Sequence, residues 1–288
     1  MTAIDLSLQR RFYAEELDAV CAFRTPGLAD ALAAVPREQF LPAGPWDVLS
    51  VSDYTPMAVP AARKTPDDDP RHVYHNIGIA IDAARRLFNG HPGTLMPWID
   101  ALALTPGARV LHVGTGTGYY TAIMAQVVGP GGHVMGIEVD DMLASHARAN
   151  LASMPWVEVR HGNGTDIGDQ PFDSILVNAG VTHPPAEWLD ALAPGGRMLL
   201  PLTVQMQPTI GKGFTLLVTR SGDGSLVVKP FGVVAIYSAV GLRDETLNSA
   251  LGEAMRRQPW PAVTRLRRDA HERSDSCWLH LNGVCFSG

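Results

Sequence analysis

The sequence predicts an α/β fold built on a Rossmann-like parallel sheet with helices on both faces. One observation is that short apolar strands alternate with helical patterns, which is typical of a parallel sheet covered by helices. The other is a glycine-rich turn between the first strand and the helix that follows it. The strands are expected at 109–113, 133–139, 157–160, 172–178 and 197–201, and the helices between them at 119–128, 140–152 and 185–193.

The segment before this pattern is predicted to be mainly helical. Apolar residues at helical spacing indicate helices at 5–24, 28–35, 76–87 and 94–104. The proline-rich stretch 42–71 is expected to be a long loop, which either covers a substrate or is merely irregular. Residues 1–105 are therefore expected to form an N-terminal helical and substrate-covering region.

The segment after the alternating pattern is predicted to end the sheet. Apolar runs at 214–219 and 226–236 flank the turn Ser221-Gly222-Asp223-Gly224, which predicts an antiparallel hairpin at the sheet edge. A helix is expected at about 243–257, with a last strand in the tail. These patterns assign 106–240 to the Rossmann-like domain and 241–288 to a C-terminal helix and tail packed on it.

Composition narrows the function classes. The 288 residues are 46% hydrophobic and carry a net charge of −6, so a general nucleic-acid or membrane-surface partner, which needs a basic surface, is not expected. The cysteines, Cys21, Cys277 and Cys285, are too few for a disulfide framework, and the last two are too far apart for a CxxC motif. We therefore expect no metal site. With no signal-like or spanning segment, a cytoplasmic location is expected.

The glycine turn predicts the cofactor. It reads VLHVGTGTGYY, and glycine suits a backbone that turns tightly against a ligand at the start of a helix. Dinucleotide sites use GxGxxG, which would require glycine where this chain has Tyr119. The GxGxG spacing found here is instead typical of S-adenosylmethionine (SAM) methyltransferases. Cofactor contacts are expected from Gly114, Thr115, Gly116, Thr117, Gly118 and Tyr119.

Residues at the ends of the later strands are expected to complete the cofactor site. Glu138, twenty residues after Gly118, ends the second strand and can accept hydrogen bonds from both ribose hydroxyls, with Val139 beside it. Asn163 and Gly164 follow the third strand, and the Asn163 amide can offer a donor and an acceptor to an adenine edge. Asn178 follows the fourth strand and is expected on the same rim.

Several motifs together resemble one family. VPREQF, VLHVGTGTGY, VEVRHGNG and LAPGGRMLLPL match, in order, motifs of the protein-L-isoaspartate O-methyltransferase family over roughly 35–240. The resemblance implies a class I methyltransferase fold, SAM as cofactor with S-adenosylhomocysteine as product, and methyl transfer to a carboxylate. The family's serine element before the glycine motif is replaced by Asn89-Gly90-His91. The position at which the family has an acidic residue, before the glycines, is occupied by His112.

These departures leave the identity of the methyl acceptor undecided. A carboxylate acceptor is already ionised near neutral pH and needs aiming rather than a base. The expected aiming residues are His91, Asn89 and Asn76, with Tyr54 or Tyr74. A hydroxyl acceptor would need a base, for which the contenders are His91, His183 and His75. His112, inside a strand, is expected to orient rather than react.

The leading hypothesis is a SAM-dependent O-methyltransferase that forms a methyl ester on a carboxylate of a peptide or small metabolite in specialised biosynthesis. The first alternative is isoaspartyl repair with a divergent acceptor site. The second is a SAM-binding or partner-binding protein whose catalytic site has decayed. The intact glycine turn and Glu138 weigh against decay.

Overall fold

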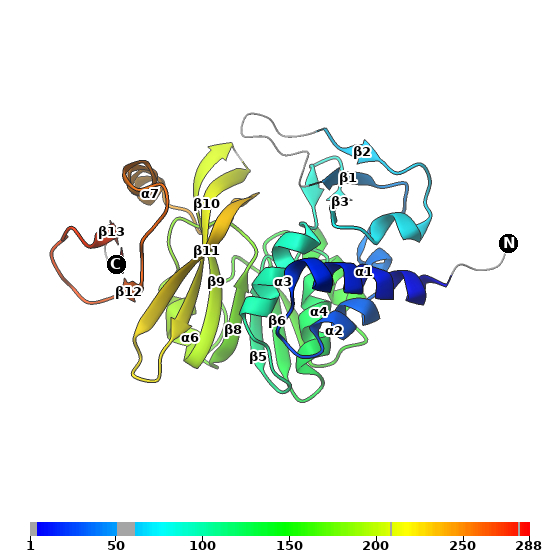
Figure 1. The fold of residues 1–288 in the computed structure, drawn as a ribbon, viewed down its shortest axis with the longest axis horizontal. Coiled ribbons are helices and arrows are strands. Elements are labelled where there is room, and N and C mark those ends of the chain that lie inside the picture. The colour runs from blue at the N-terminus through cyan, green and yellow to red at the C-terminus, as the bar shows by residue number, and fades with distance from the viewer. Residues whose placement is uncertain (1–4, 51–60, 208, 282) are drawn as a thin grey trace. The chain divides into compact units, whose positions relative to one another are not determined.

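The computed structural model describes residues 5–50, 61–207, 209–281 and 283–288, and the chain forms two compact units (Figure 1). The first unit comprises residues 1–107, 115–134 and 140–159, and the second comprises 108–114, 135–139 and 160–288. Because the chain passes between them several times, neither unit is one continuous segment. The predicted domain boundaries near residues 105 and 240 therefore stay a prediction.

The first unit contains the predicted N-terminal helices. They are α1 (Leu6–Cys21), α2 (Leu28–Ala34) and α3 (Pro92–Ala101), with α4 (Tyr119–Val128) and α5 (Asp141–Asn150) from later in the chain. The Asp5 carboxylate caps α1 by accepting the Ser7 backbone N–H at 3.0 Å. Asp100 in α3 accepts the backbone N–H groups of Arg24 and Thr25 at 2.8 and 2.7 Å, which fixes the loop between α1 and α2.

The helix predicted at 76–87 is wrong. The chain there forms β3 (Ile77–Asp82) and β4 (Leu87–Phe88), an antiparallel pair joined by a turn with Arg86 in the left-handed region at φ 54°. Ile77, Ile79 and Ile81 alternate along β3, and β-branched side chains at alternate positions favour a strand. The local pattern allows a strand as well as a helix, and pairing with β1 and β4 selects the strand.

The stretch 42–71 is more regular than predicted. β1 (Asp47–Ser50) pairs antiparallel with both β2 (Arg63–Lys64) and β3, giving the sheet order β2-β1-β3-β4. Two 3₁₀ turns, η1 (Arg37–Phe40) and η3 (Pro70–Val73), flank this sheet in sequence. Residues 51–60, which include Tyr54, lie outside the described residues. Whether this stretch covers a substrate stays a prediction.

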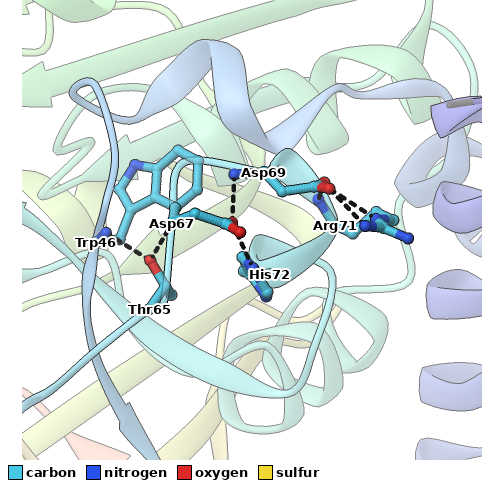
Figure 2. Close-up of polar contacts among 6 residues, drawn as sticks. All are labelled: Trp46, Thr65, Asp67, Asp69, Arg71 and His72. Atoms are coloured by element: carbon cyan, nitrogen blue, oxygen red, sulfur yellow. Dashed lines mark hydrogen bonds and ion pairs between the residues drawn. The ribbon is translucent and has the colours of Figure 1, made fainter. Parts of the chain in front are cut away.

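Figure 2 shows the polar contacts that order the end of this stretch. The Thr65 hydroxyl accepts the Trp46 backbone N–H at 2.9 Å and donates to the Asp67 carbonyl at 2.8 Å. The Asp67 carboxylate accepts the Asp69 backbone N–H at 3.0 Å and lies 2.8 Å from Nε2 of His72. Hydrogen bonds of this kind lower the pKa of the Asp67 carboxyl, chiefly through the Asp69 N–H.

The large sheet confirms the predicted α/β class. Its strand order is β13-β14-β12-β11-β10-β9-β8-β5-β6-β7. β5 is parallel to β8 and β8 to β9, whereas β9, β10 and β11 are antiparallel to one another. The strands are β5 (Arg109–Val113), β6 (His133–Glu138), β7 (Val157–His161), β8 (Phe172–Val177), β9 (Leu192–Gln207), β10 (Ile210–Arg220) and β11 (Leu226–Tyr237).

Two predictions about the C-terminal part need correction. The strand predicted at 197–201 is part of β9, a 16-residue strand that is long because it pairs with β8 and β10. The hairpin of β10 and β11 is not at the edge, because β12 (Arg265–Arg267), β14 (Val284–Ser287) and β13 (Cys277–Leu281) extend the sheet beyond it. The helices of this part are α6 (Ala186–Ala191) and α7 (Glu245–Arg257).

The second unit buries a large apolar core under its strands. Trp188 of α6 is fully buried, and Leu111, Ile137 and Ile175 pack in the same core cluster. Such burial contributes about 1.5–3 kcal/mol for each large side chain. Among the described residues, no helix combines the length and apolar character needed to cross a membrane.

Candidate functional site

Backbone hydrogen bonds in the second unit bring the ends of four neighbouring strands, β5, β6, β7 and β8, to one edge. The Gly114 N–H, just after β5, donates to the Ile137 carbonyl of β6 at 2.8 Å. The Gly162 N–H donates to the Glu138 carbonyl at 2.9 Å, and the Asn178 N–H donates to that of Val113 at 2.8 Å. The carboxyl ends of parallel strands are where α/β sheets bind ligands. The predicted cofactor residues of this unit therefore share the edge expected of a binding site.

Glu138 is the acidic side chain at this edge. It ends β6 and is 7% exposed, whereas the next residue, Val139, is 40% exposed. A carboxylate accepts hydrogen bonds only, so it suits a pair of ribose hydroxyls, and an exposed apolar neighbour suits the face of an adenine ring. The arrangement fits the adenosyl part of SAM.

The glycines of the turn are required by the backbone. Gly114, Gly116 and Gly118 have φ values of +82°, +58° and +99°, all in the left-handed region that favours glycine. A Cβ on Gly114 would lie 3.0 Å from the Asn178 carbonyl oxygen, so a side chain there would crowd the turn. α4 then begins without a side-chain cap on its first N–H groups, which leaves a helix start suited to a ligand.

Two predicted cofactor residues of the turn, Thr117 and Tyr119, use their side chains for contacts within the first unit. The Thr117 hydroxyl donates to the Phe40 carbonyl at 2.7 Å. The Tyr119 ring is 2% exposed and makes edge contacts with Phe40 and Tyr120 at centroid distances of 5.7 and 5.1 Å. Thr115 is also buried, at 5% exposure. These residues can therefore contact a cofactor mainly through their backbone groups.

The remaining predicted cofactor residues have partly structural roles. Oδ1 of exposed Asn163 accepts the N–H and the hydroxyl of Thr165 at 3.2 and 2.8 Å, so its amide NH₂ is the better placed group for an adenine edge. Gly164 has φ +94°, and a Cβ there would lie 2.8 Å from Cγ1 of Val113. Nδ2 of Asn178 donates to the Gly114 carbonyl at 3.3 Å, which supports the glycine turn.

The predicted acceptor residues lie together in the first unit, but two of them hold the backbone. Oδ1 of Asn76 accepts the Gly93 N–H at 2.7 Å, in the first turn of α3. Oδ1 of Asn89 accepts the Ile79 N–H at 3.0 Å. His91 is the residue before α3, and a Cβ on Gly78 would lie 3.3 Å from its Nε2, so the ring packs against β3. His91 is the better candidate of the three for aiming a substrate.

Arg37 is absent from the predicted site residues, although it lies in the VPREQF segment. It is 0% exposed. Its guanidinium donates to the carbonyls of Val73, His75 and Ile77 at 2.7, 3.0 and 2.7 Å, and to Oδ1 of Asn89 at 3.3 Å. Arg37 therefore fixes the segment that carries Asn76 and Asn89. Its place in the VPREQF motif could have pointed to Arg37. A buried arginine that binds mainly backbone carbonyls, however, leaves no spacing pattern in the sequence.

Tyrosine rings surround the buried guanidinium. The Arg37 Cζ lies 5.9 Å from the centroid of the Tyr13 ring and 5.5 Å from that of Tyr119. Cation–π contacts of this kind favour the charged form. Burial opposes the charge, yet the neighbouring tyrosines leave the pKa of Arg37 raised. The guanidinium therefore stays charged, and its N–H groups donate mainly to backbone carbonyls.

Gly90, which the sequence resemblance predicts at the position of the family's serine, has a backbone that disfavours a side chain. Its φ is +80°, and a Cβ there would lie 3.1 Å from Cδ2 of Leu95. Its carbonyl accepts the Tyr120 hydroxyl at 3.2 Å. The loop before α3 is therefore built around glycine, and the change from serine is accompanied by a backbone conformation that serine rarely adopts.

Other predicted contenders have fixed partners. The Tyr74 hydroxyl, buried in the first unit, donates to the Glu38 carboxylate and accepts the Arg37 N–H at 3.2 Å. Burial, the Glu38 hydrogen bond and its charge raise the pKa of Tyr74, so it stays protonated. His183 lies in the second unit, 3.0 Å from the Thr182 hydroxyl, and burial lowers its pKa. A lowered pKa keeps His183 neutral and leaves it chemically able to accept a proton.

His112 is buried in β5, and burial alone lowers its pKa from 6.5 to about 3. The unfolded chain protonates this histidine below about pH 6.5, whereas the folded chain does not until about pH 3, so stability falls as the pH falls through that window. We expect this residue alone to cost the chain about 2 kcal/mol of unfolding free energy between pH 7 and pH 5.

The measurement is urea unfolding of the unchanged chain and the His112→Leu variant at both pH values. The variant should lose less stability on acidification, by about that same 2 kcal/mol. A constant packing cost of the substitution cancels in this comparison. Parallel pH dependences in the two proteins would show that folding does not lower the pKa of His112.

Comparison with known proteins agrees with this geometry. The profile of the protein-L-isoaspartate(D-aspartate) O-methyltransferase (PCMT) family matches residues 13–242. A protein-L-isoaspartate O-methyltransferase of Aeropyrum pernix is 35% identical over 178 residues, or 60% of this chain, which spans 58% of that relative's length. A relative of the same name from Methanococcus aeolicus is 29% identical over 219 residues, covering 74% of this chain and 86% of the relative.

Solved structures share the fold. One named protein-L-isoaspartate O-methyltransferase has a TM-score of 0.61 at 24% identity, covering 85% of this chain and 68% of its own. A candidate enzyme of that name from Plasmodium falciparum, crystallised with S-adenosyl-L-homocysteine, has a TM-score of 0.57 at 18% identity and covers 80% of this chain and 97% of its own. With the glycine turn, Glu138 and a family match over most of its length, the chain belongs to the protein-L-isoaspartate O-methyltransferase family of SAM-dependent methyltransferases.

Proposed function

We propose that this chain methylates the free carboxylate of an L-isoaspartyl residue in a peptide or protein. The observation that carries the proposal is the family match over residues 13–242. It is supported by the names of the relatives, including those from Aeropyrum pernix and Methanococcus aeolicus. A role in specialised biosynthesis, the leading expectation from the sequence, receives no such support, so the repair-type acceptor now takes its place.

The chemistry asks for orientation more than for acid or base catalysis. Bound SAM supplies an electrophilic methyl group on its sulfonium. The free carboxylate of an isoaspartyl residue is an α-carboxylate with a pKa of about 3.3–3.7, and it is already a nucleophile at neutral pH. The protein therefore has to hold one carboxylate oxygen in line with the methyl group, and positioning of this kind can contribute about 7–11 kcal/mol to lowering a barrier.

We assign this positioning to the segment around His91. Arg37 holds the backbone of 73–77 through its three carbonyl contacts, and Asn89 ties that cluster to β3. The Asn76 contact with Gly93 fixes the start of α3, directly after His91. In this proposal Asn76 and Asn89 shape the acceptor loop, while the His91 imidazole aims the carboxylate.

A second candidate acceptor is a peptide carboxylate of another kind. The left-handed Gly90 favours it, because the family's serine element has been exchanged for a loop that a serine does not fit. Both candidates share the cofactor site and the absence of a need for a strong base. They differ only in the peptide that the acceptor loop accepts.

The test is methyl transfer to an isoaspartyl peptide, with the aspartyl peptide of the same sequence as the matched control. We expect turnover of the isoaspartyl peptide only. The His91→Ala variant should lose about 100-fold in kcat/KM, the effect of a misplaced acceptor, while its affinity for S-adenosylhomocysteine stays unchanged. Methylation of neither peptide, with cofactor affinity intact, would overturn the isoaspartyl proposal and favour the second acceptor or decay.

A further inference from the structure

Four metal-ligating side chains gather in the C-terminal part of the second unit. They are His271, Cys277, His280 and Cys285, and one ligand atom from each lies within 4.8 Å of every other. All four follow residue 242, where the family match ends. Cys277 and Cys285 are 3% and 1% exposed, and the two histidines are partly buried. The cluster is therefore an interior feature that the methyltransferase site does not explain.

A β-bulge explains how the strands bring three of these side chains to one face. In the β13–β14 hairpin, His280 pairs with Cys285 and Cys277 pairs with Ser287. Residues three apart normally point to opposite faces of a strand. The register shift between Cys277 and Leu279 adds one residue to β13 and so returns Cys277 to the face of His280 and Cys285. Paired strands hold these groups in place.

The fourth group, His271, comes from the loop between β12 and β13, and Asp269 orients its ring. Its Nδ1 lies 2.8 Å from the Asp269 carbonyl and 3.5 Å from the Asp269 carboxylate, so it is the donor nitrogen. Nε2 then carries a lone pair and faces Sγ of Cys277 at 3.8 Å. Histidines that bind metals are oriented in this way, with the other ring nitrogen donating to a carbonyl or carboxylate.

The remaining contacts also suit a bound cation. The Ser274 N–H donates to Sγ of Cys277 at 3.4 Å, which favours a thiolate there. Nδ1 of His280 is buried and finds no hydrogen-bond partner among the described residues. The rings of His271 and His280 meet edge to face with centroids 4.7 Å apart. A buried imidazole nitrogen without a partner is costly unless a ligand uses it.

We propose that His271, Cys277, His280 and Cys285 bind one Zn²⁺ ion as a closed structural site. Two thiolates and two imidazoles are a donor set that zinc prefers, and four protein ligands complete its tetrahedron. Zinc–sulfur and zinc–nitrogen distances of about 2.3 and 2.0–2.1 Å place tetrahedral ligands about 3.3–3.8 Å apart. The observed cluster needs only a small contraction. The sequence expectation that the chain has no metal site is therefore replaced by this proposal.

The ion would hold the outermost strands of the large sheet. The β13–β14 hairpin carries Trp278, which is 4% exposed and meets the Phe214 ring of β10 at a centroid distance of 6.4 Å. The Arg257 guanidinium of α7 donates to the Trp278 carbonyl. A ligand set that draws on a loop and both strands of the hairpin would cross-link this small region, as metals do in domains with little core of their own.

The test is the metal content of the full chain purified under reducing conditions from zinc-supplemented cells. We expect about one zinc per chain, and loss of that zinc in Cys277→Ser and Cys285→Ser. Cys21→Ser is the matched control, because Cys21 is a thiol outside the cluster, and it should retain the metal. His280→Cys keeps four ligands and should also retain it, whereas His280→Ala should not.

A second measurement removes the ambiguity of variants that fold poorly. Co²⁺ added to the chelator-treated unchanged chain should produce the visible absorption of a tetrahedral thiolate site, and Zn²⁺ should displace it and raise the melting temperature. Purified chain without stoichiometric zinc and without the cobalt spectrum would overturn the proposal. So would a Cys277–Cys285 disulfide found by mass spectrometry, or iron or copper in place of zinc.

Discussion

The Glu138→Ala variant is expected to bind S-adenosylhomocysteine about 100-fold more weakly than the unchanged chain, with the fold intact. Glu138 ends β6 at the strand edge, and its carbonyl is fixed by the Gly162 N–H at 2.9 Å. Two hydrogen bonds from ribose hydroxyls to a charged acceptor account for about 1.5–3 kcal/mol each before the side chain's own solvation is subtracted. A net loss of about 2.7 kcal/mol corresponds to 100-fold in Kd.

Isothermal titration calorimetry with S-adenosylhomocysteine measures this effect directly. Glu138→Gln keeps the side-chain shape and one acceptor oxygen. Its affinity for S-adenosylhomocysteine should lie between those of the unchanged chain and of Glu138→Ala. Glu158→Ala is the matched control, because Glu158 is a half-exposed carboxylate 3.7 Å from His133. It lies at the amino end of β7 rather than at the carboxyl end. Equal affinities for Glu138→Ala and Glu158→Ala would refute the ribose assignment.

Arg37→Met is expected to destabilise the fold by about 3–5 kcal/mol, because several acceptors lose their donor at once. The substitution keeps the apolar volume but leaves the carbonyls of Val73, His75 and Ile77 without their guanidinium donors. Each buried acceptor without a donor costs about 1–3 kcal/mol. The melting temperature should fall by about 10 °C.

The measurement is thermal and urea unfolding, with Arg11→Met as the control. Arg11 pairs with Asp30 at 2.7 Å on the surface, where both side chains are largely exposed, and such pairs contribute little. Arg37→Lys should recover only part of the loss, since one ammonium group cannot reach the four acceptors that the planar guanidinium serves. If Arg37→Met unfolds like Arg11→Met, Arg37 does not organise the acceptor loop.

Local sequence patterns predicted the elements whose conformation depends on their own residues. The GxGxG pattern predicted a tight glycine turn, and Gly114, Gly116 and Gly118 have the positive φ angles that glycine adopts most readily. The helix predicted at 76–87 failed because Ile77 and its neighbours fit both periods, and pairing with β1 and β4 decided between them. Tertiary pairing of this kind is not encoded in the segment alone.

The site residues divide in the same way. The role of Glu138 toward the ribose stays a prediction, but its place at a strand end after the glycine turn was predictable. Arg37 and the cluster of Cys277 and Cys285 were not, because their roles depend on carbonyls and histidines distant in sequence or on the register of a bulged hairpin. Spacing rules detect only ligands held by one local element.

The mixed pairing of β9 has a consequence for the order of folding. β9, β10 and β11 are consecutive antiparallel strands, so they can pair through short loops as soon as that part of the chain exists. The parallel pair of β5 and β8 joins Val110 to Ser174, which requires the whole intervening segment to be closed first. Loop-closure entropy makes such non-local pairing slow. The C-terminal meander is thus expected to form early, as a local nucleus against which β8 and then β5 can align.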